Sequence, residues 1–342
     1  MTISKKIVNQ RTIHIALGLL WMLDGAFQLQ PKMFTRAFVD QVIAPVAQGQ
    51  PGWVSSPINA AIHIFLLNSV LYNLLIAFIQ LTIGGLILCK RTTRYGLYMS
   101  VCWGLIVWSL GEGYGGIFSG HASLLTGAPG AALLYVFIAL AVIPSKKKRE
   151  RQTVASWLVF AWLVLWVGGG AYQLLPQQGT TADIGSTIAT NAEGAPSWMA
   201  SADLHTASRL ESLGPHAEAI FPHKTTEPMI MSHMDTQVMS MPTMVSKIRD
   251  TGRGFIVAFG LALIVIGIGV LFEGIIRLVV LLLGVLLSLS FWVIGQSMGG
   301  FYTGMATDLN SGPLFVLLGV AILMCSNFRF VPRWRNPHKK SA

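Results

Sequence analysis

Charged side chains are scarce in this sequence. Only 11% of the 342 residues are Asp, Glu, Lys or Arg, whereas 53% are apolar. A typical soluble domain carries about 25% charged residues. The composition therefore excludes an ordinary water-soluble fold and favours a chain that crosses a lipid bilayer several times.

Cysteine is rare as well, and the common motifs of soluble cofactor enzymes are missing. Cys89, Cys102 and Cys325 form no CxxC pair, so we expect neither a disulfide framework nor a thiol redox motif. The glycines of residues 111–120 follow an apolar helix rather than a strand, which excludes a phosphate-binding loop. A His-Glu-x-x-His zinc motif is also absent. We expect a protein that is not catalytic on its own.

Apolar runs of spanning length recur along the chain. A membrane-spanning helix needs about 20 mainly apolar residues. Eight segments qualify, of which the third, fourth and eighth need flanking residues: 13–29, 65–88, 97–110, 131–143, 157–174, 255–272, 278–294 and 314–324. We therefore predict an all-α polytopic protein of the cell membrane with eight transmembrane helices.

The basic residues alternate with the predicted loops. They gather at the N-terminus, in every second loop and in the C-terminal tail: 5–11, 90–94, 146–151, Arg277 and 329–340. By the positive-inside rule these segments face the cytoplasm, so both termini are expected there. The other connections are expected outside: 30–59, 119–129, 177–247 and 302–313. The net charge of +10 is then a topology signal, and we expect no nucleic-acid binding.

Two phrases of the first half return in the second half. "WMLDGAFQLQP" (21–31) recurs as "WVGGGAYQLLP" (166–176), and "GEGYGGIFSGHAS" (111–123) recurs as "GQSMGGFYTGMAT" (295–307). The offset grows from 145 to 184 residues, so the second copy contains an insertion of 39 residues. We predict two four-helix units, 1–148 and 149–342, the second of which includes an extracytoplasmic loop at 177–247. Four spans return the chain to the same side, so the units are related in parallel.

Residues 80–107, "QLTIGGLILCKRTTRYGLYMSVCWGLIV", place a short basic turn between two apolar helices. This run resembles the second and third helices of DoxX-like four-helix membrane proteins. Residues 17–29 are similar to the first helix of that family, and residues 265–289 repeat the pattern. The family includes the membrane subunit of a thiosulfate:quinone oxidoreductase. The resemblance implies a role in a quinone-linked redox complex, with quinone as a cofactor and other subunits as partners.

The first copy carries ionisable residues where the second copy has neutral ones. The matched pairs are Asp24 with Gly169, Glu112 with Gln296, and His121 with Met305. The predicted topology places Asp24, Glu112 and His121 at one depth near the outer surface, together with His63. Gln28 lies one turn after Asp24 on the same helical face.

Two interpretations of these polar residues stay open. A carboxylate near a bilayer usually faces the bundle interior, a partner or a water-filled cavity. The group is then a pocket for a proton, a quinone or a metal ion. Alternatively, the side chains are shallow and solvated among lipid headgroups, or Glu112 caps a helix locally.

The insertion concentrates histidine and methionine. Thioether and imidazole side chains suit copper, Cu(I) especially. The candidate ligands are His205, His216, His223, Met229, Met231, His233, Met234, Met239, Met241 and Met244. The alternative is that methionine serves as an adaptable apolar residue in a loop packed over the outer mouth of the bundle.

Three function classes fit these patterns. The first is an integral membrane subunit or accessory protein of a quinone-linked or extracytoplasmic redox system, with a polar pocket on the outer side of the first unit. The second is a copper-binding or copper-delivery membrane protein. The third is a small-solute carrier, although no broken helix at the bilayer midplane supports it. We expect the first and keep copper handling as the alternative.

Overall fold

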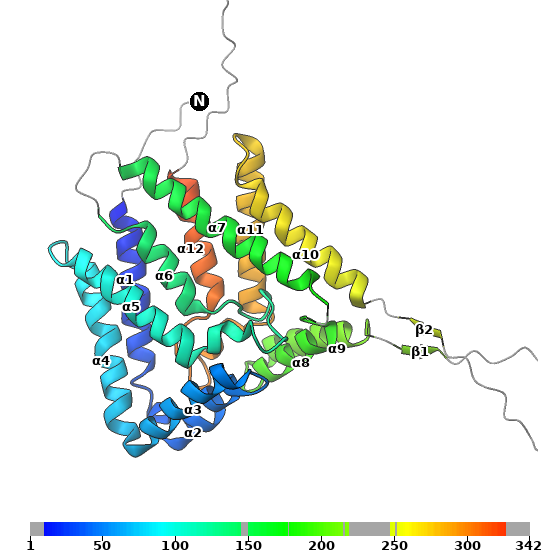
Figure 1. Cartoon of the computed structure of the whole chain (residues 1–342), viewed down its shortest axis with the longest axis horizontal. Coiled ribbons are helices and arrows are strands. Elements are labelled where there is room, and N and C mark those ends of the chain that lie inside the picture. Colours follow the sequence, from blue (N-terminus) through cyan, green and yellow to red (C-terminus); the bar gives the residue numbers. More distant parts are fainter. Residues whose placement is uncertain are drawn as a thin grey trace, which may run out of the picture.

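The computed structural model describes residues 10–144, 150–176, 178–214, 216–218, 247–249 and 252–325. Most of this part of the chain is helical (Figure 1). Its two strands, β1 (His216–Glu218) and β2 (Lys247–Arg249), pair antiparallel. The prediction of a helical fold is therefore confirmed.

Six α-helices and several short helical elements make up the first half of the chain. The α-helices are α1 (Gln10–Phe27), α2 (Arg36–Phe38), α3 (Gly52–Leu67), α4 (Ser69–Leu88), α5 (Thr93–Ile106) and α6 (Ala131–Ala141). The short elements are the 3-10 helices η1 (Pro31–Phe34), η3 (Ala44–Ala47) and η5 (Gly113–Gly116) and the π-helices η2 (Val39–Ile43) and η4 (Val107–Gly111).

The described part of the second half contains six α-helices and one short 3-10 helix. Its elements are α7 (Glu150–Leu174), α8 (Thr181–Asn191), α9 (Ser197–Glu211), α10 (Gly252–Gly269), α11 (Ile275–Val293), η6 (Ser297–Gly300) and α12 (Ser311–Cys325). Each of the eight predicted spans overlaps mainly with one helix, namely α1, α4, α5, α6, α7, α10, α11 and α12, although the span 65–88 also includes the end of α3.

Four helices of the described chain are long and apolar enough to cross a bilayer. They are α4, Val154–Leu174 of α7, α10 and α11. The other predicted spans are less apolar or shorter. For example, α6 has 11 residues and extends for about 17 Å, whereas the hydrocarbon core is about 30 Å thick.

The helices pack in neighbouring pairs. α1 lies against α4, α7 against α10, α5 against α6, and α11 against α12. Glycine permits the closest approaches, because a Cβ added at Gly84 would lie 2.8 Å from the carbonyl oxygen of Gly18, and one at Gly260 would lie 2.8 Å from that of Gly170. Small residues at such contacts are typical of helices that associate in membranes.

Two connections that we predicted as external loops contain helices. α3 lies within the predicted loop 30–59 and runs beyond it, and α8 and α9 lie within 177–247. Figure 1 shows all three lying across the ends of the long helices, at the side remote from the start of α1. α3 buries only Val54, Ile58 and Phe65, and such a one-sided apolar face is typical of a helix that lies along a surface.

Candidate functional site

A cavity of about 430 Å³ lies between α1, α3, α4, α5 and α6. We call it the apolar cavity, because most of its lining is aliphatic or aromatic. Its polar lining side chains are few: Asp24, Gln28, Gln80, Glu112, Tyr135, Thr307 and Asp308, with the indole groups of Trp21 and Trp103 and the hydroxyl of Tyr72. This volume and this mixture of groups are typical of small-molecule sites in proteins.

Glu112 enters this cavity from a sharply turned loop. It follows η4, and the next residues reverse the chain through the left-handed region, with φ of 58° at Tyr114 and 63° at Gly115. A Cβ at Gly115 would overlap the carbonyl group of Pro129, so the turn requires glycine. The loop brings the Glu112 carboxylate to the start of α6, where it accepts a hydrogen bond from the N–H of Ala132 at 3.0 Å.

Burial governs the protonation of this carboxyl group. Glu112 lies beyond the predicted third span, and burial raises its pKa to about 8. The nearby charge of Asp308 contributes to this rise in the pKa, whereas the N–H groups of Ala132 and Ala131 oppose it. Burial also raises the pKa of Asp308, against hydrogen bonds from Thr307 and Asn310. The Glu112 carboxyl group can therefore carry a proton near neutral pH, and burial shifts the pKa of the Asp308 carboxyl group in the same direction.

Asp24 supplies a third carboxyl group from α1. Its side chain is 1% exposed and is hydrogen bonded to the hydroxyl of Tyr135 on α6. The Tyr135 ring in turn packs on Trp21, with the ring centroids 4.4 Å apart. The contact ties the carboxyl group to the wall between α1 and α6.

Three buried oxygens of the cavity lack a hydrogen-bond partner among the described residues. They are Oδ1 of Asp24, Oε1 of Gln28 and Oε1 of Gln80. Buried polar atoms in folded proteins are nearly always hydrogen bonded. The lining therefore offers acceptors to a molecule that brings O–H or N–H groups.

The structure brings together three of the five residues that we predicted for the pocket. Asp24, Gln28 and Glu112 line the apolar cavity. His63 does not line this cavity. It is exposed on α3, because that helix turns Ile62 and Phe65 toward the cavity instead.

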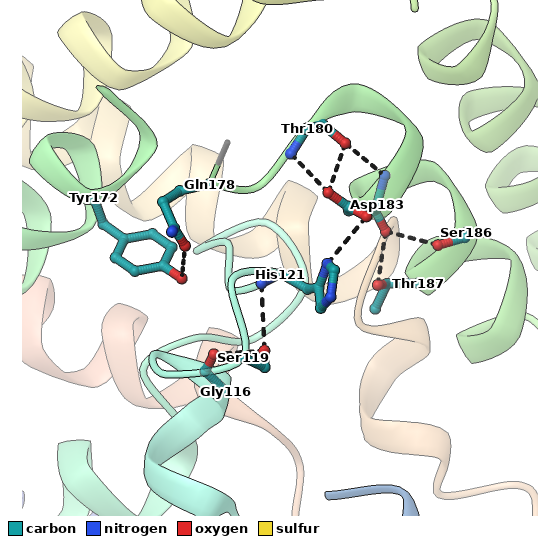
Figure 2. Close-up of polar contacts among 9 residues, drawn as sticks. All are labelled: Gly116, Ser119, His121, Tyr172, Gln178, Thr180, Asp183, Ser186 and Thr187. Carbon is teal, nitrogen blue, oxygen red and sulfur yellow. Dashed lines mark hydrogen bonds and ion pairs between the residues drawn. The ribbon is translucent and has the colours of Figure 1, made fainter. Parts of the chain in front are cut away.

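His121 lies in a second cavity of about 400 Å³, which we call the polar cavity. Its Nδ1 lies 3.0 Å from Oδ1 of Asp183. Figure 2 shows the His121 ring directed from its loop toward Asp183 of α8, which also accepts a hydrogen bond from the Thr180 hydroxyl at 2.6 Å. The imidazole thus joins the two halves of the chain, and it lines a cavity other than the one that holds Asp24.

Sequence reasoning missed Gln80, Tyr135 and Asp308. Asp308 directly follows the repeated phrase 295–307, so a carboxylate beside that phrase was a usable signal. Tyr135 and Gln80 lie inside helices that are apolar on all sides, so the sequence pattern does not reveal which face of each helix is turned toward the cavity. Asp308 comes from the second half, so both halves of the chain line the cavity.

The described residues contain no group of three or more His, Cys, Asp or Glu side chains that could hold a metal ion. Among the predicted copper ligands, His205 is exposed on α9 and His216 belongs to β1. The other eight lie outside the described residues: His223, Met229, Met231, His233, Met234, Met239, Met241 and Met244.

The loop that carries Glu112 has a counterpart before α12. Gln296 takes the place of Glu112, and its Oε1 accepts a hydrogen bond from the N–H of Gly312 at 3.0 Å. The same left-handed turn follows, with φ of 52° at Met298 and 73° at Gly299. The indoles match as well, since Trp108 donates to Pro129 and Trp292 donates to Leu309, each at 2.7 Å.

Comparison with known proteins adds no relative. No protein-family model matches the chain, and neither a curated protein nor a solved structure matches it.

Proposed function

We propose that the chain is an integral membrane protein that binds a quinone-class ligand in the apolar cavity and acts as a subunit or accessory protein of a quinone-linked redox system. One observation carries the proposal. Three carboxyl groups from separate elements, Asp24, Glu112 and Asp308, line a single, mainly apolar cavity. Such a site suits a ligand with an apolar body and a polar headgroup.

The cavity reaches the outer face of the helix bundle. Its lining includes Ile64 of α3, Leu75 of α4 and Ile106 of α5, which are 51%, 46% and 46% exposed. Exposed aliphatic side chains on membrane helices face lipid. A ligand dissolved in the bilayer can therefore enter sideways and leave its apolar tail among these side chains.

The polar groups match both redox forms of a quinone headgroup. The carbonyl oxygens of an oxidised quinone need donors, which a protonated Glu112 or Asp308 supplies. The hydroxyl groups of a reduced quinol need acceptors, which the unpartnered oxygens of Asp24, Gln28 and Gln80 supply. Hydrogen bonds that satisfy buried acceptors contribute affinity because those acceptors are costly to leave unpaired.

We further propose eight spans, formed by two duplicated units, with both termini in the cytoplasm. The matched hydrogen bonds of Glu112 and Gln296 support duplication, as does the parallel order of paired helices in each half. The resemblance to DoxX-like proteins agrees with this architecture and with a quinone-linked role.

Ligand binding tests the proposal directly. The purified protein in lipid nanodiscs is titrated with a short-chain benzoquinone and with its quinol, and bound ligand is measured by absorbance after gel filtration. Ile76 of α4 lines the cavity, so Ile76→Trp should fill it and weaken binding at least tenfold. Phe78 of the same helix is 66% exposed and outside the cavity.

Phe78→Trp is therefore the matched control, and it should bind like the unmodified protein. Equal binding by both variants would mean that the ligand only partitions into lipid, which contradicts the proposed site. Absence of saturable binding to the unmodified protein would contradict the proposed ligand class.

A further inference from the structure

We propose that Glu112 and Asp308 exchange protons between the aqueous phase, which reaches them through the polar cavity, and the ligand in the apolar cavity. This inference rests on the proposed function. It assigns a role to the polar cavity, which is not required for ligand binding.

The two cavities share part of their walls. Glu112, Asp308, Thr307 and Ala131 line both. A carboxyl group in such a wall can accept a proton on one side and release it on the other when its side chain rotates. The shared position of two such groups is the geometric basis of the inference.

The polar cavity is built to hold water. Its lining includes the hydroxyl groups of Ser119, Thr126 and Thr187 and the amide of Asn310. Buried waters occupy roomy sites that offer several polar partners, and a volume of about 400 Å³ holds several waters. A chain of waters would connect the carboxyl groups with the cavity mouth.

The mouth lies where exposed polar residues line the cavity. Gln48 and His121 both line it and are exposed. The His121 imidazole is held by Asp183 of α8 (Figure 2), so the mouth is bounded by both halves of the chain. Protons then enter beside α8, which lies across the ends of the long helices (Figure 1).

Unpartnered buried oxygens mark the inner end of the path. Oδ1 of Asp24 has no partner among the described residues and lies in the apolar cavity. The other groups that face Glu112 are Asp308, Tyr135 of α6 and, across the cavity, Tyr72 of α4. Among the described residues, no Lys or Arg lines either cavity, so a proton can serve as the counter-charge of these carboxyl groups.

Each transfer is a simple exchange. A hydrated proton in the polar cavity forms an O–H bond with the Glu112 or Asp308 carboxylate and leaves a neutral water behind. That O–H bond then breaks as the proton passes to an oxygen of the ligand, and the carboxylate is restored. Electrons for any reduction of the ligand come from a separate donor and are not part of this step.

Infrared difference spectroscopy of the ligand-free protein tests the path. Transfer into D₂O shifts the C=O band of a protonated carboxyl group as hydrogen is replaced by deuterium. Glu112→Gln and Asp308→Asn should each remove part of that band. Thr187→Trp should fill the polar cavity and slow the exchange at least tenfold.

Thr190→Trp is the matched control, because Thr190 lies on the same helix, is exposed and lines neither cavity. It should exchange at the unmodified rate. Gln48→Trp covers the mouth from an exposed position, so it gives a second test if Thr187→Trp does not fold. Unchanged exchange in a folded blocking variant, or an unchanged band in both carboxyl variants, would overturn the proposal.

Ligand binding is measured separately, so the two failures can be told apart. If the blocking variants slow the exchange but the protein does not bind quinone, the proton path to the carboxyl groups is supported and the proposed ligand class is contradicted. If the protein binds quinone but the blocking variants exchange at the unmodified rate, the proposed ligand is supported and the proton path is contradicted.

Discussion

The Glu112 carboxylate accepts a hydrogen bond from the backbone N–H of Ala132 at 3.0 Å, across the loop that separates η4 from α6. Gln296 makes the same bond with its amide oxygen in the second half. The loop therefore requires an acceptor at this position and does not require a charge. Of the two loops, only the first carries an ionisable carboxyl group at this position, which indicates that Glu112 has a role other than stabilising the fold.

Substitution of Glu112 should separate these two requirements. Glu112→Gln keeps the acceptor, so its unfolding temperature at pH 6 should stay within a few degrees of the unmodified protein, while quinone affinity falls. Glu112→Leu leaves the N–H of Ala132 unpaired and should lose about 1–3 kcal/mol of stability. Thermal unfolding in detergent measures both, and equal stability of the two variants would contradict this account.

The reverse exchange in the second half should restore nothing. Gln296 is 2% exposed and lines neither cavity. Gln296→Glu places a carboxyl group where no ligand can reach it, and burial disfavours its ionised form. In the Glu112→Gln background, quinone titration should therefore show no recovery of affinity. A recovered affinity would mean that the second loop also contacts the ligand.

Stability should fall as the pH rises from about 4.5 to about 8. Burial raises the pKa of Glu112 to about 8 from 4.5, so the folded state binds this proton more tightly than the unfolded state. Its contribution is complete below the unfolded pKa and is lost as the pH rises through the folded pKa, with a slope of up to about 1.4 kcal/mol per pH unit.

Glu112→Gln removes this titration and should flatten the slope of unfolding free energy against pH. A residual slope of the same sign is expected from Asp308, since burial raises its pKa too. Urea unfolding across this pH range measures the difference. A variant with the unmodified slope would assign the titration to other groups.

Two adjacent glycines of α7 should respond in opposite ways to alanine. A Cβ at Gly169, the counterpart of Asp24, would overlap the side chain of Leu124, whereas a Cβ at Gly168 meets nothing within 4 Å. Gly169→Ala should therefore cost about 1–3 kcal/mol through overpacking. Gly168→Ala should be neutral or stabilise by up to about 1 kcal/mol through helix propensity. Thermal unfolding of both variants tests the packing of α7 against Leu124, which lies in the loop before α6.

Reporter fusions should place the insertion outside the cell membrane. Basic residues occupy every second connection, which the positive-inside rule predicts to be cytoplasmic, and the insertion lies in one of the other connections. A fusion after Met234 should therefore be active with a periplasmic or extracellular reporter and inactive with a cytoplasmic one. The opposite pattern would reverse the proposed topology.

Local features of the chain were readable from the sequence. Apolar runs predict the helices because backbone groups in hydrocarbon must bond within their own segment. The matched phrases at 111–123 and 295–307 predicted that one kind of loop occurs twice, and the hydrogen bonds of Glu112 and Gln296 agree with that. Asp24 and Gln28 were found together because one helical turn separates them.

Only the tertiary structure decided which residues share a cavity. Asp308 reaches Glu112 because the loop before α12 packs beside the loop before α6, and no sequence period encodes that contact. His63 is excluded because the rotation of α3 about its axis depends on the side chains that it meets. The sequence by itself determined a helical, membrane-suited chain with a repeated loop and a carboxylate in one copy. The composition of the cavities depended on long-range packing, in which segments far apart in the chain are brought together by burial of their apolar faces.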